Sequence, residues 1–428
     1  MNRESRATPA STEVTTVNDQ AYCRFCAARL HHTFVDLGMS PPCQSHVEAH
    51  QLNHMEAFFP LHALVCDKCF LVQLREYVSP TDIFGEYAYF SSYSDSWLRH
   101  AKAYTDLMVE RFGIGPRSQV IELASNDGYL LQYFVEKGVP VLGIEPAANV
   151  AEAARAKGVP TLVRFFGEKL AGELAAEGTR ADLLLGNNVL AHVPDLNDFV
   201  AGMKGLLKPH GVITMEFPHL LRLMEENQFD TIYHEHFSYF SFTTVERVFA
   251  AHGLVLFDVE ELPTHGGSLR ILGRHAEDES KPVGPRVAAL KWQEERAGLG
   301  RLGTYLRFGE RVKETKRKLL EFLIRVRREG KSIVGYGAPG KGNTLLNYCG
   351  IRTDFLEYTV DRNPYKQGKF TPGTHIPIHA PERIRQTRPD YVLILPWNLK
   401  DEVIEQVGYI REWGGRFVVP IPEVMVYL

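Results

Sequence analysis

Residues 120–131, VIELASNDGYLL, decide the fold of the central part of this chain. An apolar strand that ends in Glu122 is followed by a turn of small and polar residues at 124–128 and by a helix that begins at Tyr129. Glycine and small side chains let a backbone approach a ligand at the carboxyl end of a strand, where open parallel sheets bind cofactors. The segment therefore predicts a cofactor site at the edge of a parallel sheet.

The segments around this turn alternate between strand and helix patterns. GYLLQYFVEKG (128–138) and NVAEAARAKG (149–158) are helical in pattern. The other strands read VPVLGIEP (139–146), ADLLLGNNVLAHV (181–193) and HGVITMEFP (210–218). Such alternation is typical of a parallel sheet covered by helices on both faces, so the predicted fold class is α/β.

A second alternation begins after a charged, helix-forming stretch at 286–329. Its strands read KSIVGYG (331–337), FLEYTVD (355–361), PDYVLILP (389–396) and RFVVPIP (416–422). We expect them to form a second Rossmann-like sheet with helices between the strands. The predicted units are a disordered tail (1–20), a zinc-binding domain (21–80), a cofactor-binding domain (81–285) and a C-terminal Rossmann-like domain (286–428).

Composition excludes several classes of function. The 428 residues are 44% hydrophobic and 23% charged, which is usual for a folded globular protein, and they carry a formal charge of -4. This charge supplies no broad basic surface for nucleic acid. The sequence lacks an apolar run of about 18 residues and an apolar N-terminal signal segment, so we expect a cytoplasmic protein without a membrane partner. Nothing in the sequence demands more than a monomer.

Four of the six cysteines form two C-x-x-C pairs. Each pair presents two thiolates from one tight turn, and two such turns complete a closed tetrahedron around Zn²⁺ with no position open for water. We therefore predict a structural zinc site. Two alternatives are four unrelated buried thiols and a substituted ligand from Cys43, His54 or His62. The predicted ligands are Cys23, Cys26, Cys66 and Cys69.

The turn after Glu122 distinguishes between cofactors. It lacks the G-x-G-x-x-G spacing of a dinucleotide site, and its acidic character is unfavourable for a diphosphate. Glu145, about twenty residues downstream, is suited to accept hydrogen bonds from ribose hydroxyls. The pattern E-x-A-x-N-D-G resembles motif I of class I methyltransferases, which bind S-adenosylmethionine (SAM). By that resemblance the cofactor residues are Glu122, Ser125, Asn126, Gly128 and Glu145, with Asn187 or Asn188 closing the pocket.

Residues 231–241, TIYHEHFSYFS, concentrate groups for acid and base chemistry. A histidine can take a proton from carbon at neutral pH, and Glu235 or a tyrosine could orient it or stabilise developing charge. One alternative is a metal site at His234 and His236. Another is a purely structural cluster of aromatic and histidine side chains.

Residues 333–348, IVGYGAPGKGNTLLNY, form a glycine-rich loop before a helix that starts near Asn343. Backbone N–H groups at a helix start, together with Lys341, suit a phosphate group. The loop is not a P-loop, because Gly342 follows the lysine where Ser or Thr is required. A turn that serves only packing is the alternative.

Together these motifs and THGGSLR (264–270) resemble the family of nucleotide-sugar C-methyltransferases, which make branched deoxysugars for antibiotics and surface polysaccharides. The resemblance runs from about Cys23 to the C-terminus. It implies a class I methyltransferase domain between a zinc-binding domain and a Rossmann-like C-terminal domain, and a substrate that is a thymidine-diphosphate 4-keto sugar. It implies His236 as the base, Tyr233 and Glu235 beside it, His192 and Tyr87 in the same cavity, and Lys341 and Asn343 at the diphosphate.

Other functions remain open from the sequence. A nicotinamide-dependent oxidoreductase could use the glycine-rich loop at 333–348 for its dinucleotide. A sugar-nucleotide-binding protein without activity would lack the base or the cofactor turn, and both are present. O- or N-methylation of a similar substrate is a further alternative. No residue pattern decides which sugar, which carbon or which nucleotide carrier is used.

Overall fold

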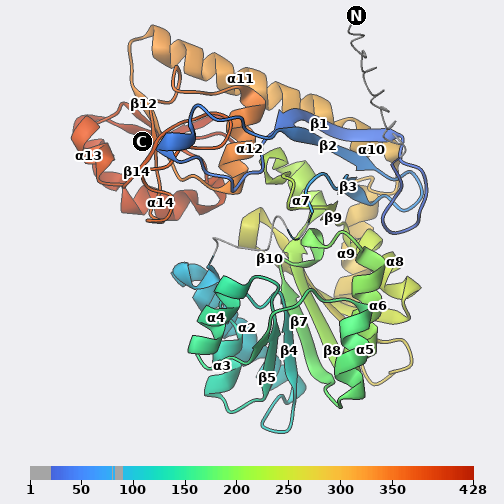
Figure 1. The fold of residues 1–428 in the computed structure, drawn as a ribbon. Helices are drawn as coiled ribbons and strands as arrows, with labels where there is room; N and C mark the ends of the chain where they lie inside the picture. The colour runs from blue at the N-terminus through green and yellow to red at the C-terminus, as the bar shows by residue number, and fades with distance from the viewer. Residues whose placement is uncertain (1–20, 80, 82–89) are drawn as a thin grey trace, which may run out of the picture.

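The computed structural model describes residues 21–79, 81 and 90–428, and Figure 1 labels its elements. The predicted tail (1–20) and Tyr87 lie outside the described residues. The described residues form three β-sheets, of four, seven and six strands.

The seven-stranded central sheet has the order β10-β11-β8-β7-β4-β5-β6. Neighbouring strands from β6 to β8 are parallel, while β11 runs antiparallel between β8 and β10. All four residues of β4 are buried, as expected where helices cover both faces of a sheet. The strands are β4 (Val120–Leu123), β5 (Val141–Ile144), β6 (Thr161–Leu162), β7 (Ala181–Asn187), β8 (Leu207–Pro218), β10 (Leu254–Leu262) and β11 (Ser268–His275).

Helices flank this sheet on both faces (Figure 1). The first of them is capped at both ends, because the Ser94 hydroxyl accepts a hydrogen bond from the Trp97 N–H and Gly113 adopts a left-handed conformation. The helices are α2 (Asp95–Phe112), α3 (Leu131–Glu136), α4 (Ala148–Ala156), α5 (Glu168–Ala176), α6 (Leu196–Leu206), α8 (Phe242–Ala251) and α9 (Pro285–Arg296). The short α7 (Leu220–Glu225) instead packs in the core that the N-terminal sheet shares with the C-terminal domain.

The N-terminal sheet has the order β1-β2-β3-β9 and is antiparallel. Its fourth strand follows the Tyr-His-Glu-His segment, so the chain returns from the central domain to complete the first sheet. Sequence reasoning did not predict this pairing, because a two-residue strand has no recognisable pattern. The strands are β1 (His32–Ser40), β2 (Phe59–Val65), β3 (Val72–Leu74) and β9 (Ser238–Tyr239).

The C-terminal sheet has the order β14-β13-β12-β15-β16-β17 and is parallel except for β17. It contains the four predicted strands and two short strands at its edges. The strands are β12 (Ile333–Tyr336), β13 (Thr359–Val360), β14 (Ile378–His379), β15 (Tyr391–Ile394), β16 (Arg416–Val419) and β17 (Met425–Tyr427). The helices of this part are α10 (Leu302–Leu306), α11 (Phe308–Arg328), α12 (Gly340–Cys349), α13 (Arg383–Thr387) and α14 (Lys400–Gln406).

Short 3-10 turns connect many of these elements. They are η1 (Ala49–Gln51), η2 (Ser91–Tyr93), η3 (Leu190–His192), η4 (Phe229–Thr231), η5 (Thr264–Gly266), η6 (Trp397–Leu399) and η7 (Gly408–Trp413).

One hydrophobic core joins the N-terminal sheet to the C-terminal domain. Phe34 of β1 stacks on Phe308 of α11 with ring centroids 4.6 Å apart, and both side chains are almost fully buried. Figure 1 shows α11 running along both units, which lie side by side above one end of the central sheet. Among the described residues, no helix combines the length and the apolar composition needed to cross a bilayer.

Candidate active site

The turn between β4 and α3 lies at the carboxyl end of the central sheet. Ala124 and Asn126 adopt left-handed backbone conformations with φ of 54° and 49°, which are uncommon outside glycine and concentrate at functional sites. The Asn126 N–H donates to Glu145 Oε2 at 2.9 Å, and the Ser91 N–H donates to Asn126 Oδ1 at 3.0 Å. The fold thus brings together two predicted cofactor residues that are 19 positions apart.

Glu145 follows β5 and is almost completely buried. Its Oε1 accepts the Ala147 N–H at 2.9 Å, while Oε2 accepts the Asn126 N–H. Burial raises the pKa of this carboxyl, although the two backbone N–H groups oppose the shift. Each oxygen keeps a second lone pair that can accept a hydroxyl hydrogen.

Glu122 is completely buried, and neither carboxylate oxygen makes a hydrogen bond of ordinary geometry among the described residues. Burial raises its pKa well above the ordinary value, the nearby Tyr129 hydroxyl opposes that rise, and the charges of Glu145 and Asp127 add to it. An isolated buried carboxylate is costly unless a cation accompanies it. Glu122 therefore fits a cationic ligand, whereas Asp127 Oδ2 already pairs with Lys157 Nζ at 3.0 Å. SAM carries both an ammonium and a sulfonium group.

Two motif residues, Ser125 and Gly128, are closely packed. Ser125 is fully buried against Gly143 of the neighbouring strand. A Cβ added to Gly128 would meet Val159 at 3.1 Å and Ala154 at 3.3 Å, so the close approach of α4 accounts for this glycine. Among the described residues the Ser125 hydroxyl has no hydrogen-bond partner, and the ligand contacts of Ser125 and Gly128 stay predictions.

Asn187 and Asn188 follow the strand next to β4. Asn187 Nδ2 donates to the Tyr129 hydroxyl at 3.4 Å. Asn188 has a left-handed φ of 54°, and its Nδ2 lies 3.0 Å from His265 Nε2. The pair therefore connects the cofactor turn with the loop between β10 and β11.

His236 has the geometry of a base. Its Nδ1 lies 2.9 Å from the Thr231 carbonyl oxygen, which can only accept, so Nδ1 carries the proton and Nε2 keeps a lone pair. Burial lowers the pKa of His236 well below its ordinary value, and the charges of His192, His265 and Lys341 lower it further. The imidazole is therefore neutral at pH 7, which is the form that accepts a proton.

Two further predicted residues surround this imidazole. The ring centroid of Tyr233 lies 4.0 Å from that of His236, and the ring of His192, from η3, lies 4.7 Å away in an edge-to-face arrangement. Burial lowers the pKa of His192 to about 4, so it is neutral as well. Tyr87, predicted for the same cavity, lies outside the described residues.

Glu235 has its contacts on the N-terminal domain. The Cys43 thiol donates to Glu235 Oε1 at 3.5 Å, and burial raises the pKa of Glu235 to about 7. His234 lies edge-on to Phe59 with ring centroids 6.0 Å apart and is buried, as expected for a packing residue. Cys43 is thus a neighbour of the proposed site and not a fifth thiol at the zinc cluster.

Lys341 and Asn343 lie on α12 but in different surroundings. Lys341 Nζ donates to Asn398 Oδ1 at 2.7 Å and lies 4.5 Å from the centroid of the Trp397 ring. Asn343 is 1% exposed, and its Nδ2 donates to the Cys43 carbonyl at 2.6 Å. The geometry therefore gives no support to the prediction that Asn343 contacts a diphosphate, because its amide joins α12 to the N-terminal domain.

The glycines of this loop are close-packed. A Cβ on Gly337 would meet Pro396 at 2.6 Å, one on Gly340 would meet the Cys43 sulfur at 2.9 Å, and one on Gly342 would meet Leu395 at 3.0 Å. Packing against the N-terminal domain and β15 therefore accounts for the glycine-rich pattern.

The four predicted zinc ligands form one cluster. Their sulfur atoms all lie within 4.8 Å of one another, with Cys23 to Cys69 and Cys26 to Cys66 both at 3.5 Å. Thiolates about 2.3 Å from a tetrahedral zinc are about 3.8 Å apart, so the cluster fits Zn²⁺. Gln73 Nε2 donates to the Cys23 sulfur at 3.2 Å and supports the site from outside.

Sequence reasoning missed two residues near the base. Asp230 is fully buried beside the Tyr-His-Glu-His segment, and its Oδ2 accepts the Trp397 indole N–H at 2.8 Å. His265 belongs to the THGGSLR motif, which was noted without a role. Its two following glycines were the available signal, since paired glycines indicate an unusual backbone that packs closely.

Comparison with known proteins places these features in a family context. Three family models match in chain order: a zinc binding domain at 23–84, a methyltransferase domain at 97–259 and a C-methyltransferase C-terminal domain at 263–422. The C-methyltransferase NovU of Streptomyces niveus is 37% identical over 401 residues, which cover 94% of this chain and 95% of that protein.

Shorter similarities concern other methyltransferases. The ubiquinone biosynthesis O-methyltransferase of Chelativorans sp. is 26% identical over 25% of this chain and 46% of its own length. The magnesium protoporphyrin IX methyltransferase of Synechocystis, solved with bound SAM, is 12% identical, covers 41% of this chain and 78% of its own, and has a TM-score of 0.32. The full-length match, together with the three family models, confirms the predicted class I methyltransferase fold with an N-terminal zinc-binding domain.

Proposed function

This chain belongs to the C-methyltransferase family, and we propose that it transfers the methyl group of SAM to the carbon beside the ketone of a nucleotide-linked 4-keto-deoxysugar. The product would be a branched-chain sugar, and thymidine diphosphate is the proposed carrier. A single observation carries this proposal. His236 holds its Nδ1 on the Thr231 carbonyl, so its Nε2 keeps a lone pair, and the rings of His192 and Tyr233 lie beside it at the cofactor edge of the central sheet.

A C–H bond next to a ketone is a weak acid, so the reaction needs a positioned base and a donor for the enolate oxygen. His236 Nε2 takes the proton, and the Thr231 carbonyl holds the ring in the tautomer that can accept it. Tyr233 stacks close to the imidazole and limits its rotation. The partly buried Lys341 offers a positive charge for the diphosphate.

The residues around the β4 turn would hold the cofactor. Glu122 and Asp127 would face its cationic methionine part, and Glu145 would accept the ribose hydroxyls. SAM, when bound there, supplies an electrophilic methyl group to the enolate carbon and leaves as S-adenosylhomocysteine. Because this sulfonium needs no activation, the chain's remaining task is to align the sugar and exclude water.

The zinc cluster supports a cytoplasmic location for this enzyme. Cysteine pairs remain available as thiolate ligands in a reducing compartment, whereas they tend to form disulfides outside it. We propose deoxysugar biosynthesis, such as that for an antibiotic, as the setting.

The proposal is tested by replacing His236. The protein is incubated with a panel of nucleotide-linked 4-keto sugars and SAM carrying a labelled methyl group, and methyl incorporation is followed by mass spectrometry. We expect His236→Asn to lower turnover by roughly 10²–10⁴-fold, because the amide can still donate to Thr231 but cannot accept the proton. His234→Asn, in the same segment, is the matched control and should keep most of the activity if it folds.

Two results would overturn the assignment. If His236→Asn keeps near-normal turnover, the base lies elsewhere. If the wild-type protein methylates no keto sugar of the panel while it binds S-adenosylhomocysteine, the substrate class is wrong although the family assignment stands.

A further inference from the structure

The loop between β10 and β11 holds His265 in a constrained conformation. His265 has a left-handed φ of 54° and ψ of 19°, and Gly266 and Gly267 follow with φ of 90° and 114°. A Cβ on Gly266 would meet the Trp397 ring at 2.6 Å, and one on Gly267 would meet Arg222 at 2.8 Å. The loop is therefore packed against both the central and the C-terminal domain at its two glycines.

Hydrogen bonds fix this loop at nearly every residue. The Thr264 hydroxyl donates to Glu216 Oε1 at 2.8 Å, Gln228 Nε2 donates to the Gly266 carbonyl at 2.7 Å, and the His219 N–H donates to the Gly267 carbonyl at 3.0 Å. Strained backbone that is held by so many contacts is characteristic of functional sites.

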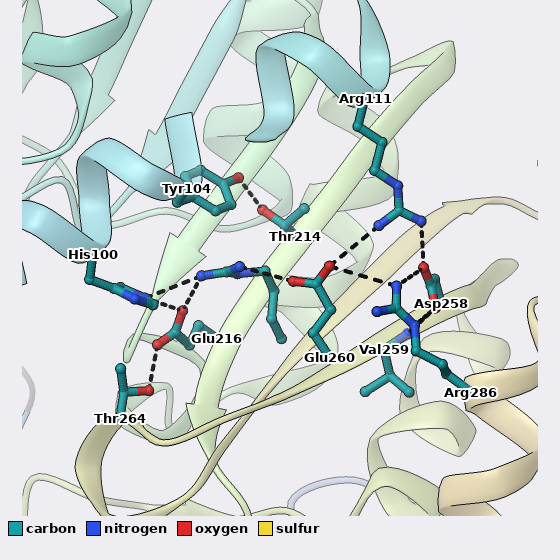
Figure 2. A network of polar contacts seen from close by, with 11 residues as sticks. His100, Tyr104, Arg111, Thr214, Glu216, Asp258, Val259, Glu260, Thr264 and Arg286 are labelled. Carbon is teal, nitrogen blue, oxygen red and sulfur yellow. Dashed lines mark hydrogen bonds and ion pairs between the residues drawn. The ribbon is translucent and has the colours of Figure 1, made fainter. Parts of the chain in front are cut away.

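Glu216 is itself part of a buried polar network, which Figure 2 shows on β8, β11 and α2. Its Oε2 accepts from Arg270 at 2.8 Å and lies 2.9 Å from His100 Nε2, and all of its side chain is buried. The network ends at the Thr264 hydroxyl, directly before His265 (Figure 2). The carboxylate is therefore a rigid anchor for the loop.

The imidazole of His265 has one nitrogen engaged and one available. Asn188 Nδ2, which can only donate, lies 3.0 Å from Nε2, so the proton of a neutral ring is on Nδ1. Among residues 21–79, 81 and 90–428, the contact with Asn188 is the only side-chain hydrogen bond of this ring, so Nδ1 has no partner there. Trp97 contacts the ring edge-on with centroids 5.2 Å apart and fixes its orientation.

We propose that His265 is a catalytic residue that donates a hydrogen bond from Nδ1 to the ketone oxygen of the substrate as that oxygen becomes an enolate. This inference rests on the proposed function, because it assumes a carbon acid beside a ketone. His236 takes the proton from carbon, the electron pair of the C–H bond enters the new C=C bond, and the carbonyl π pair moves to oxygen. No proton leaves His265 in this step.

Geometry places His265 on the side of the base, because its partner Asn188 lies four residues before His192, whose ring is 4.7 Å from that of His236. The charge of His265 would lower the pKa of His236, and burial lowers the pKa of His265 to about 4, assisted by the charge of Lys341. A neutral imidazole is a weak acid, so it can stabilise an oxyanion without protonating it and ending the reaction before methyl transfer.

The test separates enolate formation from methyl transfer. The protein is saturated with S-adenosylhomocysteine and thymidine-diphosphate 4-keto-6-deoxyglucose in D₂O, and deuterium uptake beside the ketone is measured by mass spectrometry. We expect His265→Ala to slow this exchange by roughly 10²–10³-fold, the usual loss for one oxyanion donor. Its calorimetric affinity for S-adenosylhomocysteine should stay near that of the wild type.

His265→Asn is the matched variant, because asparagine tolerates the left-handed conformation and carries an N–H near the position of Nδ1. We expect it to retain more exchange than His265→Ala. Thr264→Val removes the hydroxyl that contacts Glu216 and should slow exchange by acting through His265. In a His265→Ala background it should therefore have no further effect.

Three outcomes overturn the inference. The first is wild-type exchange in His265→Ala, which leaves the proposed function intact. The second is a large loss of S-adenosylhomocysteine affinity with unchanged exchange, which assigns His265 to the cofactor. The third is that, at saturating sugar, Lys341→Met loses deuterium exchange while His265→Ala keeps it. This result would make Lys341 the group that stabilises the enolate oxygen. Absence of exchange in the wild type would remove the proposed function together with this inference.

Discussion

At the scale of single residues, the buried carboxyl of Glu122 makes cofactor binding depend on protons. Its pKa lies well above the ordinary value because of burial, so the site favours the uncharged form of this carboxyl before a cation arrives. A cationic ligand favours the ionised form and lowers that pKa, so binding of SAM should release a proton. Calorimetry of SAM binding in buffers of different ionisation enthalpy measures this release directly.

Glu122→Gln is the matched variant, because it keeps the size of the side chain but cannot ionise. In this variant the enthalpy of SAM binding should no longer depend on the buffer, and SAM should bind more weakly. The folding stability of the variant should be unchanged or improved. Proton release of equal size in the variant and the wild type would contradict the role of Glu122.

Residue identities could be predicted best where one local motif contains the whole chemistry. The zinc cysteines and the Tyr-His-Glu-His segment are of this kind: the structure clusters the four cysteines and brings Tyr233 against His236. For Gly128 and Asn343 the ligand contact stays a prediction, and the sequence did not reveal what lies behind each of them. The contacts that account for them, with Ala154 and with Cys43, depend on packing between distant segments.

At the scale of elements, the short pairing of β3 with β9 links the zinc cluster to the base. Cys66 and Cys69 form the turn before β3, and Gln73 and Val72 of this strand pair with Ser238 and Tyr239, directly after His236. Metal binding and folding are one equilibrium in small zinc domains. Loss of zinc should therefore displace the base segment without acting on the β4 turn.

We accordingly expect removal of zinc by a chelator to abolish methyl transfer, while S-adenosylhomocysteine still binds, and readdition of Zn²⁺ to restore activity. Metal analysis, turnover and calorimetry on the same sample measure the three quantities. Full activity with well below one zinc per chain would refute the link.

Sequence patterns predicted the longer elements better than the short ones. Apolar strands such as β4 and β15 and the amphipathic α11 have enough residues to show a period. By contrast, β9 and the η5 turn owe their conformations to partners far away in the chain, so their positions could not be derived locally.

At the scale of the whole molecule, the proposed site forms only where the domains meet. The base belongs to the segment shared by the central domain and the N-terminal sheet, whereas Lys341 and Trp397 come from the C-terminal domain. Trp397 donates to Asp230, next to the base segment, so this contact joins the C-terminal domain to the chemistry. A site between domains can align two substrates that are held by different domains.

This arrangement predicts the alkaline limb of activity. Burial lowers the pKa of Lys341 from its ordinary 10.5 to about 8, although the charge of Asp230 opposes the shift. The lysine is charged below pH 8 and neutral above it, so kcat/KM for the sugar nucleotide should fall as the pH rises through about 8. Unfolding does not explain such a fall, because between about pH 8 and 10.5 the unfolded lysine binds more protons than the folded one. This group therefore makes the folded state more stable as the pH rises.

Lys341→Arg, whose guanidinium stays charged, should lack this alkaline fall in kcat/KM, whereas Lys400→Met on α14 should retain it. A pH profile of the Lys341→Arg variant that matches the wild type would show that the charge of the C-terminal domain does not hold the substrate.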